Sequence, residues 1–179
     1  NKRHRINARQ SPEIYLKSQL NILLVSNYRP DEQFSMSGFA RMLKTGLEQV
    51  GQQVEEIWPR PVFGKLGKLL PKTGKWLAYA DKYLLFPKTL RRHLRKSPPD
   101  ISHVCDHSNS VYLPHLGQCP HLVTCHDVIA IRSALGHFPE TRVGLMGKKL
   151  QRRILSNLRI ADYVTCDSEN SRQDLLQLV

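Results

Sequence analysis

Five short apolar runs alternate along the chain with longer segments that have helical periodicity. A continuous apolar run is typical of a strand buried on both faces of a parallel sheet. Apolar residues three or four positions apart predict a helix packed on such a sheet. The runs that predict strands are residues 21–28, 54–58, 101–105, 121–125 and 163–166. The segments that predict helices are residues 39–50, 75–96, 110–116, 141–161 and a last one starting at 171. The alternation predicts an α/β fold with a mainly parallel sheet.

Single residues add detail to the helices. Pro87 should break or kink the helix over 75–96. Ser171, followed by Asp174 three residues later, forms a capping box and predicts the start of the last helix. The helix over 75–96 should place one apolar side on the core, formed by Trp76, Ala80, Tyr83, Leu84, Leu90 and Leu94.

Charge is distributed unevenly over the 179 residues, whose net charge is +12. Residues 60–96 contain eleven Lys and Arg but only one acidic residue, and residues 1–20 contain five against one. The rest of the chain sums to −2. We therefore predict a basic tail over 1–20 and one domain over 21–179 with a basic insert at about 60–96. Such asymmetry indicates an anionic partner, although a solvated basic surface is the simpler interpretation.

The composition also indicates where in the cell the protein is located. No apolar run approaches the roughly 20 residues that span a bilayer, and no apolar stretch of a secretory signal follows the basic start. Four cysteines in a chain of this length favour reduced thiols. We expect a cytoplasmic protein.

Polar and titratable residues follow the predicted strands. Ligands of open parallel sheets bind outside the carboxyl ends of the strands. Asp106 and His107 follow one strand, His126 and Asp127 follow another, and Ser168 follows the last. These residues are therefore candidates for a binding or catalytic site.

Ser37 and Gly38 form a further candidate, because they should directly precede a helix. A glycine there lets the backbone approach a ligand, and a helix N-terminus favours an anion. The dinucleotide-binding pattern G-x-G-x-x-G and the Walker A pattern are both absent. Gly38 could equally serve only to ease the turn.

Residues 103–126 are rich in His and Cys, but their spacing matches no zinc site. Strand alternation places Cys105 and Cys125 in the sheet interior, where free cysteines usually pack. We expect no metal and no cofactor.

The basic insert combines cations with aromatic residues. This pattern is typical of an interfacial helix on anionic lipid, but the aromatics could instead face the core while the cations are solvated. No nucleic-acid-binding module is recognisable, so nucleic acid is not an expected partner. The residues proposed to contact an anionic membrane are Lys65, Lys68, Lys72, Lys75, Trp76, Arg91, Arg92 and Arg95.

Four segments together resemble the N-terminal domain of a GT-B fold glycosyltransferase of glycosyltransferase family 4. They are residues 21–26 with the loop to Gly38, residues 99–107, residues 122–127 (Leu-Val-Thr-Cys-His-Asp) and residues 161–175. The segments occur in the family's order and span most of 21–179.

The resemblance implies a Rossmann-like three-layer α/β/α domain that binds the acceptor, facing a second domain that binds a nucleotide-sugar donor. It implies a transfer that retains anomeric configuration and requires no metal. His126 would lie in the cleft near the transferred sugar, and Asp127 would orient it or bind acceptor hydroxyls. Gly38 and its loop would line the cleft near donor phosphates or acceptor. Asp106 and His107 would lie on the acceptor side, the acceptor being a glycan or a lipid.

Two departures from the family's pattern stand out. A single glycine, Gly38, follows Ser37 where the family commonly has a glycine pair. The sequence ends at Val179, where the donor domain is expected, so we interpret it as an acceptor half that is inactive alone. A non-catalytic flavodoxin-like module that binds a partner, or a basic nucleic-acid-binding domain, are the alternatives. In the main interpretation the protein associates peripherally with the inner face of the membrane.

Overall fold

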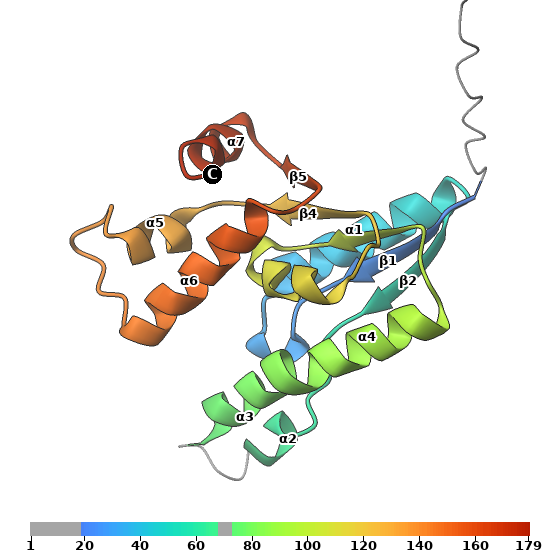
Figure 1. Ribbon diagram of the computed structural model, residues 1–179, viewed down its shortest axis with the longest axis horizontal. Coiled ribbons are helices and arrows are strands. Elements are labelled where there is room, and N and C mark those ends of the chain that lie inside the picture. Colours follow the sequence, from blue (N-terminus) through green and yellow to red (C-terminus); the bar gives the residue numbers. More distant parts are fainter. Residues whose placement is uncertain (1–18, 68–72) are drawn as a thin grey trace, which may run out of the picture.

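A single parallel sheet forms the centre of the protein (Figure 1). The computed structural model describes residues 19–67 and 73–179. The strands are β1 (Asn21–Val25), β2 (Gln53–Ile57), β3 (Ile101–Val104), β4 (His121–Cys125) and β5 (Tyr163–Cys166). They are ordered β2-β1-β3-β4-β5, and every adjacent pair is parallel. The predicted α/β class is therefore confirmed.

Helices cover both faces of the sheet and make three layers. On one face, α1 (Phe34–Gln49) packs on Ile22 and Leu24 of β1. On the other face, Leu23 and Val25 lie in a larger core with residues of three further elements. These are α4 (Phe86–Lys96), the 3-10 helix η3 (His107–His115) and α6 (Leu145–Leu158). The shorter helices α5 (Ile129–Leu135) and α7 (Glu169–Leu176) also contribute to this core.

A long helical rod carries most of the basic insert. It consists of α3 (Gly74–Ala80), the π-helical segment η2 (Asp81–Leu85) and α4, and the short helix α2 (Gly64–Gly67) precedes it. Pro87 lies in the first turn of α4, directly after the π segment, which is where the sequence predicts a distortion.

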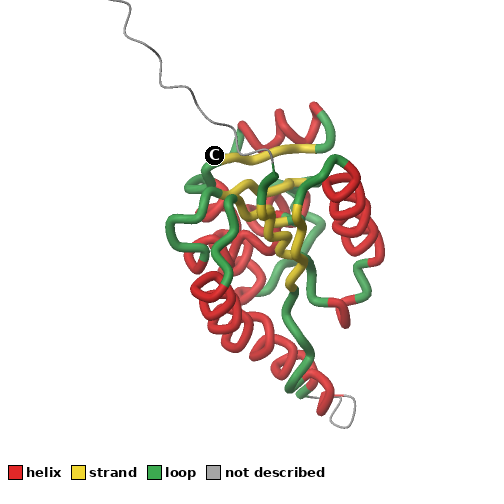
Figure 2. The backbone as a smooth tube through the Cα atoms, turned by 90° about the vertical axis from the view of Figure 1, so that its right-hand side faces the viewer, coloured by secondary structure: helices red, strands yellow, loops and turns green. Residues whose placement is uncertain are grey.

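The predicted apolar side of this rod is only partly correct. Leu90 is fully buried, but Trp76 is 62% exposed and Leu84 is 64% exposed. Figure 2 shows that one end of the rod extends beyond the strands. Trp76 therefore has no sheet to pack against, and the π segment shifts the helical register at Leu84.

Four helix starts differ by more than one residue from the prediction, and one of them is η3, which begins at His107 instead of residue 110. The first helix begins at Phe34, so Ser37 and Gly38 lie inside it rather than before it. Helix α6 begins at Leu145 instead of near 141. The cap of the last helix is Ser168 and not Ser171, because the Ser168 hydroxyl accepts a hydrogen bond from the Ser171 amide at 3.1 Å.

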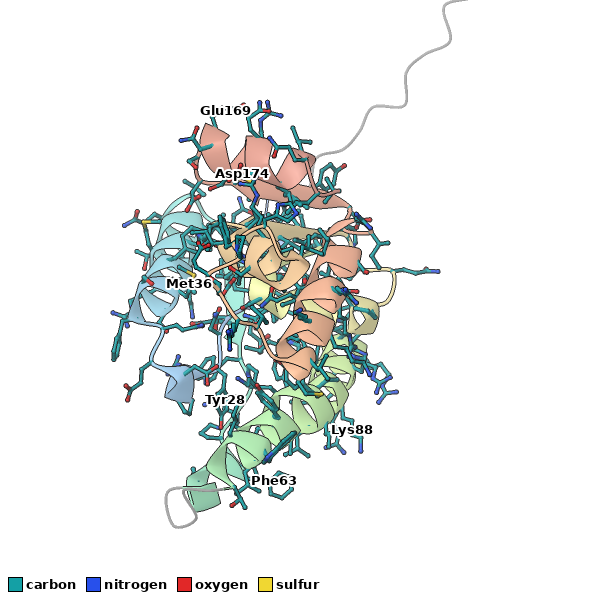
Figure 3. All side chains as sticks on the ribbon, turned by 90° about the vertical axis from the view of Figure 1, so that its left-hand side faces the viewer. Tyr28, Met36, Phe63, Lys88, Glu169 and Asp174 are labelled. Atoms are coloured by element: carbon teal, nitrogen blue, oxygen red, sulfur yellow. The ribbon has the colours of Figure 1, made fainter. Side chains whose placement is uncertain are left out.

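A buried carboxylate fastens the rod to the loop after β1. Asp81 is fully buried and accepts hydrogen bonds from the Tyr28 hydroxyl at 3.0 Å and from the amides of Phe63 and Gly64 at 2.9 and 2.8 Å. Tyr28 lies beside the rod in Figure 3. Burial and the bond to Asp81 raise the pKa of Tyr28 above its usual value, so its hydroxyl remains a donor.

This fastening predicts opposite effects of two glycine substitutions. A β-carbon at Gly64 would overlap the Tyr28 hydroxyl, whereas one at Gly46 in α1 meets nothing within 4 Å. Gly64→Ala is expected to destabilise the protein by about 1–3 kcal/mol, as overpacking does. Gly46→Ala should stabilise it by about 0.5–1 kcal/mol. Urea unfolding measures both, and equal effects of the two variants would show that the contact around Gly64 is unimportant.

Candidate functional site

An open cleft of about 620 Å³ lies at the carboxyl ends of the strands. Its position, beside β1 and β3 where the strand order changes direction, is the usual ligand site of this topology. Four residues predicted from the sequence line it: Asp106, His107, His126 and Asp127. The wall opposite them comes from Glu32, Gln33, Phe34, Ser35 and Met36 at the start of α1. Figure 3 labels Met36 at the start of α1.

Asp106 builds the floor of this cleft. Its carboxylate accepts hydrogen bonds from Asn27 Nδ2 at 2.5 Å and from the amide and hydroxyl of Ser108 at 2.9 and 2.8 Å. Asn27 Oδ1 in turn accepts from Asn109 Nδ2 at 2.9 Å. Asp106 is 4% exposed, so its main effect is to cap η3 and to tie the end of β3 to the end of β1.

Both ring nitrogens of His126 are held by acceptors. Nδ1 lies 2.9 Å from Asp167 Oδ2, and Nε2 lies 3.0 Å from the carbonyl oxygen of Cys105. The Phe39 ring packs against the imidazole edge-on, with centroids 4.9 Å apart. Burial lowers the pKa of His126, but the bonds to Asp167 and Cys105 outweigh it and the net pKa is raised. The geometry thus favours an imidazolium that donates on both sides.

The first of the two roles implied for Asp127, orienting His126, is filled by Asp167. Asp127 Oδ1 accepts a hydrogen bond at 2.9 Å from the amide of Ile129, the first residue of α5, a helix that the sequence pattern does not predict. Cys125 and Cys166 are register partners on β4 and β5, so the residues that follow them are neighbours. Strand pairing is the signal that could have identified Asp167.

Two further histidines near the cleft are buried and neutral. His107 is 8% exposed, and its Nδ1 lies 3.3 Å from Asp106 Oδ1 without hydrogen-bond geometry. Burial lowers its pKa. His103 Nε2 pairs with Thr124 Oγ1 at 2.7 Å, and burial lowers its pKa to about 4. His126 therefore differs from its neighbours in charge.

The His126–Asp167 pair predicts a pH-dependent effect of Asp167→Asn. Because the folded-state pKa of His126 is raised, the pair stabilises the protein fully below the ordinary histidine pKa of about 6.5. This stabilisation is lost as the pH rises through the raised pKa. Asp167 is about half exposed, so we expect a cost of about 0.2–1 kcal/mol at pH 6 and almost none at pH 9.

Urea unfolding of the wild type and of the Asp167→Asn protein between pH 6 and pH 9 measures the difference in the free energy of unfolding. Burial, the main cause of the lowered pKa of His103 and His107, is the same in both proteins, so subtraction removes that part of their contribution. A loss of stability in Asp167→Asn that does not change with pH would contradict a charged His126–Asp167 pair.

Three predicted residues lie outside the cleft. Ser37 faces a separate cavity of about 270 Å³ together with Arg29 and Arg41. Gly38 is exposed on α1 with no atom near its missing β-carbon, so no close backbone approach requires a glycine there. Ser168 caps α7. None of these three residues lines the cleft, although Ser168 is linked to it through Ser171, whose hydroxyl accepts from Ser168 at 2.9 Å and donates to the His126 carbonyl oxygen at 2.6 Å.

No group of His, Cys, Asp and Glu within 19–67 and 73–179 has the arrangement of a metal site. Cys105 and Cys125 are buried in the sheet, as predicted, and burial raises the pKa of both thiols to about 12. Such thiols are poor nucleophiles and poor metal ligands at neutral pH.

Most of the described cations of the basic insert face solvent, whereas Lys82 is largely buried and pairs with Asp31 at 2.7 Å. Lys65, Lys75, Arg91, Arg92 and Arg95 are exposed, and Trp76 is exposed beside them on α3. Lys68 and Lys72 lie outside the described residues. Among the helices that are described, none is long and apolar enough to cross a bilayer.

Comparison with known proteins identifies the family. No curated sequence and no solved structure is significantly similar to the chain. The family model of Glycosyltransferase Family 4 matches residues 41–179, which contain β2 to β5 and the cleft residues Asp106, His107, His126 and Asp127. This match favours a glycosyltransferase over a non-catalytic flavodoxin-like module. The chain belongs to Glycosyltransferase Family 4 and has the fold expected of an N-terminal domain of that family.

Proposed function

We propose that this domain binds the acceptor in a retaining transfer of a sugar from a nucleotide-sugar donor. The observation that carries the proposal is the cleft that joins Asp106, His107, His126 and Asp127 in a chain of Glycosyltransferase Family 4. The donor would be bound by a second domain facing this cleft. Asp127 and Ser108, both at the cleft surface, are suitable partners for acceptor hydroxyls.

In this reaction the bond from the anomeric carbon to the diphosphate breaks, and a bond to the acceptor oxygen forms. The acceptor proton leaves with the diphosphate. Negative charge grows on the leaving group in the transition state, so a fixed positive charge nearby lowers the barrier. His126, held as an imidazolium by Asp167 and Cys105, would supply that charge without reorganising. The transfer is proposed to need neither metal nor cofactor.

A transfer assay on a protein that includes the proposed donor domain tests the proposal. The protein is incubated with radiolabelled nucleoside-diphosphate sugars and with lipid or glycan acceptors, and labelled product is separated. We expect label in the acceptor with the anomeric configuration of the donor, established by NMR. Release of free sugar alone, or inversion of configuration, would contradict the proposal.

We further propose that the exposed cations of α3 and α4 dock the domain on an anionic membrane. Arg91, Arg92 and Arg95 project from α4, while Lys75 and Trp76 project from α3. Cations next to an exposed aromatic residue suit the lipid headgroup region. Docking there would bring the cleft to acceptors in the bilayer.

Vesicle binding tests this surface with a matched pair of double variants. Arg92→Gln with Arg95→Gln removes two charges from α4, and Arg41→Gln with Lys44→Gln removes two from α1 on the opposite face. At about 1 kcal/mol per cation, the α4 variant should bind phosphatidylglycerol-containing vesicles about 30-fold more weakly. The α1 variant should bind like the wild type. Equal binding to neutral and anionic vesicles, insensitive to salt, would refute membrane docking.

A further inference from the structure

An apolar groove lies between α3–η2 and α6. Its volume is about 260 Å³, with Tyr79 and Tyr83 on one wall and Met146 and Leu150 on the other. Lys149 and Arg153 of α6 also line it, and both are exposed. No acidic side chain is among the groove's lining residues.

The groove adjoins a cavity that in turn adjoins the cleft that contains His126. A cavity of about 160 Å³ lies between them and shares Tyr79, Tyr83 and Leu150 with the groove. The same cavity shares Gln33, Ser108 and Gln151 with the cleft. The three hollows therefore adjoin one another in a row from His126 to the apolar walls of α6.

The mouth of the groove is apolar and exposed. Met146 is 62% exposed and the preceding Leu145 is 86% exposed. On the other side, Trp76 is 62% exposed and packs edge-on against Tyr79, with ring centroids 5.9 Å apart. Large exposed apolar side chains thus flank the groove on both sides, as they do at interaction sites.

An unsatisfied polar atom lies where the groove joins the cleft. Gln151 Oε1 is buried and has no hydrogen-bond partner among the described residues. A buried acceptor of this kind costs free energy unless a ligand donates to it. Gln151 lines both the cleft and the connecting cavity, so a ligand hydroxyl or a water molecule held by a ligand could supply that donor.

We propose that this groove binds the hydrocarbon chain of a lipid acceptor whose phosphate group is held by Lys149 and Arg153. The inference rests on the proposed function and names its acceptor class, an amphipathic lipid phosphate. Apolar walls match the chain, the two cations match the phosphate, and Gln151 receives a polar group of the acceptor on the way to His126. A free sugar or glycan acceptor would leave the apolar groove empty.

Direct binding of decyl phosphate tests the proposal without any donor or turnover. Titration calorimetry below the critical micelle concentration compares decyl phosphate with decanol and with inorganic phosphate. Met146→Glu places a charge in the groove and should weaken the binding of decyl phosphate at least 10-fold. Met42→Glu changes a methionine of similar exposure on α1 and should have no effect.

A separate double variant tests the contact with the phosphate group. Lys149→Gln with Arg153→Gln should weaken the binding of decyl phosphate about 10-fold and leave decanol binding unchanged.

Equal affinity of the Met146→Glu and Met42→Glu proteins for decyl phosphate would overturn the proposal. Inorganic phosphate that binds as tightly as decyl phosphate would overturn it as well. Sugar transfer to a water-soluble glycan with no decyl phosphate binding would overturn the groove proposal while supporting the proposed transferase. Specific decyl phosphate binding in a protein that includes the proposed donor domain but has no transferase activity would support the groove and refute the proposed function.

Discussion

Replacing His126 by alanine is expected to lower the rate of sugar transfer by about 100- to 1000-fold. This is the usual effect of removing one preorganised electrostatic group from an active site. The imidazole is fixed by Asp167 Oδ2 at 2.9 Å and by the Cys105 carbonyl at 3.0 Å, and it lines the cleft. Its charge is therefore positioned before substrate arrives, and alanine removes it completely.

The measurement is kcat and KM for transfer, together with urea unfolding to confirm that the variant is folded at assay temperature. His93→Ala is the matched control, because His93 also pairs with a carboxylate, that of Glu55 at 3.3 Å, but lies on α4 away from the cleft. The control should keep wild-type kinetics. An unchanged rate in a folded His126→Ala protein would show that His126 does not assist the transfer.

The architecture was predictable because its strands are buried on both faces. Residues 121–125 and 163–166 are predicted as strands with the limits that β4 and β5 have in the structure. The start of α1 was not predictable from periodicity, because Phe34 is 78% exposed and the first turn has no apolar face. Helix α5 was missed since its seven residues are too short to show a clear period.

The sequence predicted only those residues of the candidate site that directly follow a strand. Four titratable residues after β3 and β4 converge on one cleft because parallel strands end at the same edge of the sheet. The partner of His126 depends on which strands are adjacent, and that is a property of the folded sheet. The groove between α3–η2 and α6 could not be predicted either, because its walls are about 65 residues apart in sequence and meet only in the folded protein.

Filling the cleft with a bulky side chain should abolish transfer without touching any polar group. Ala130 of α5 lines the cleft and is exposed, so Ala130→Trp would place an indole in the space proposed for the acceptor. We expect kcat/KM for the acceptor to fall at least about 100-fold, because a misplaced or excluded substrate loses the benefit of orientation. Ile129→Trp is the matched control, since Ile129 is the neighbouring residue, is 62% exposed and is not among the cleft's lining residues.

The ratio of kcat/KM between these two tryptophan variants is the most direct test that sugar transfer takes place at this cleft. The account predicts near wild-type kcat/KM for Ile129→Trp and a loss of at least about 100-fold for Ala130→Trp, with both proteins folded. Equal kcat/KM for the two variants would place the reaction elsewhere on the protein and contradict the account.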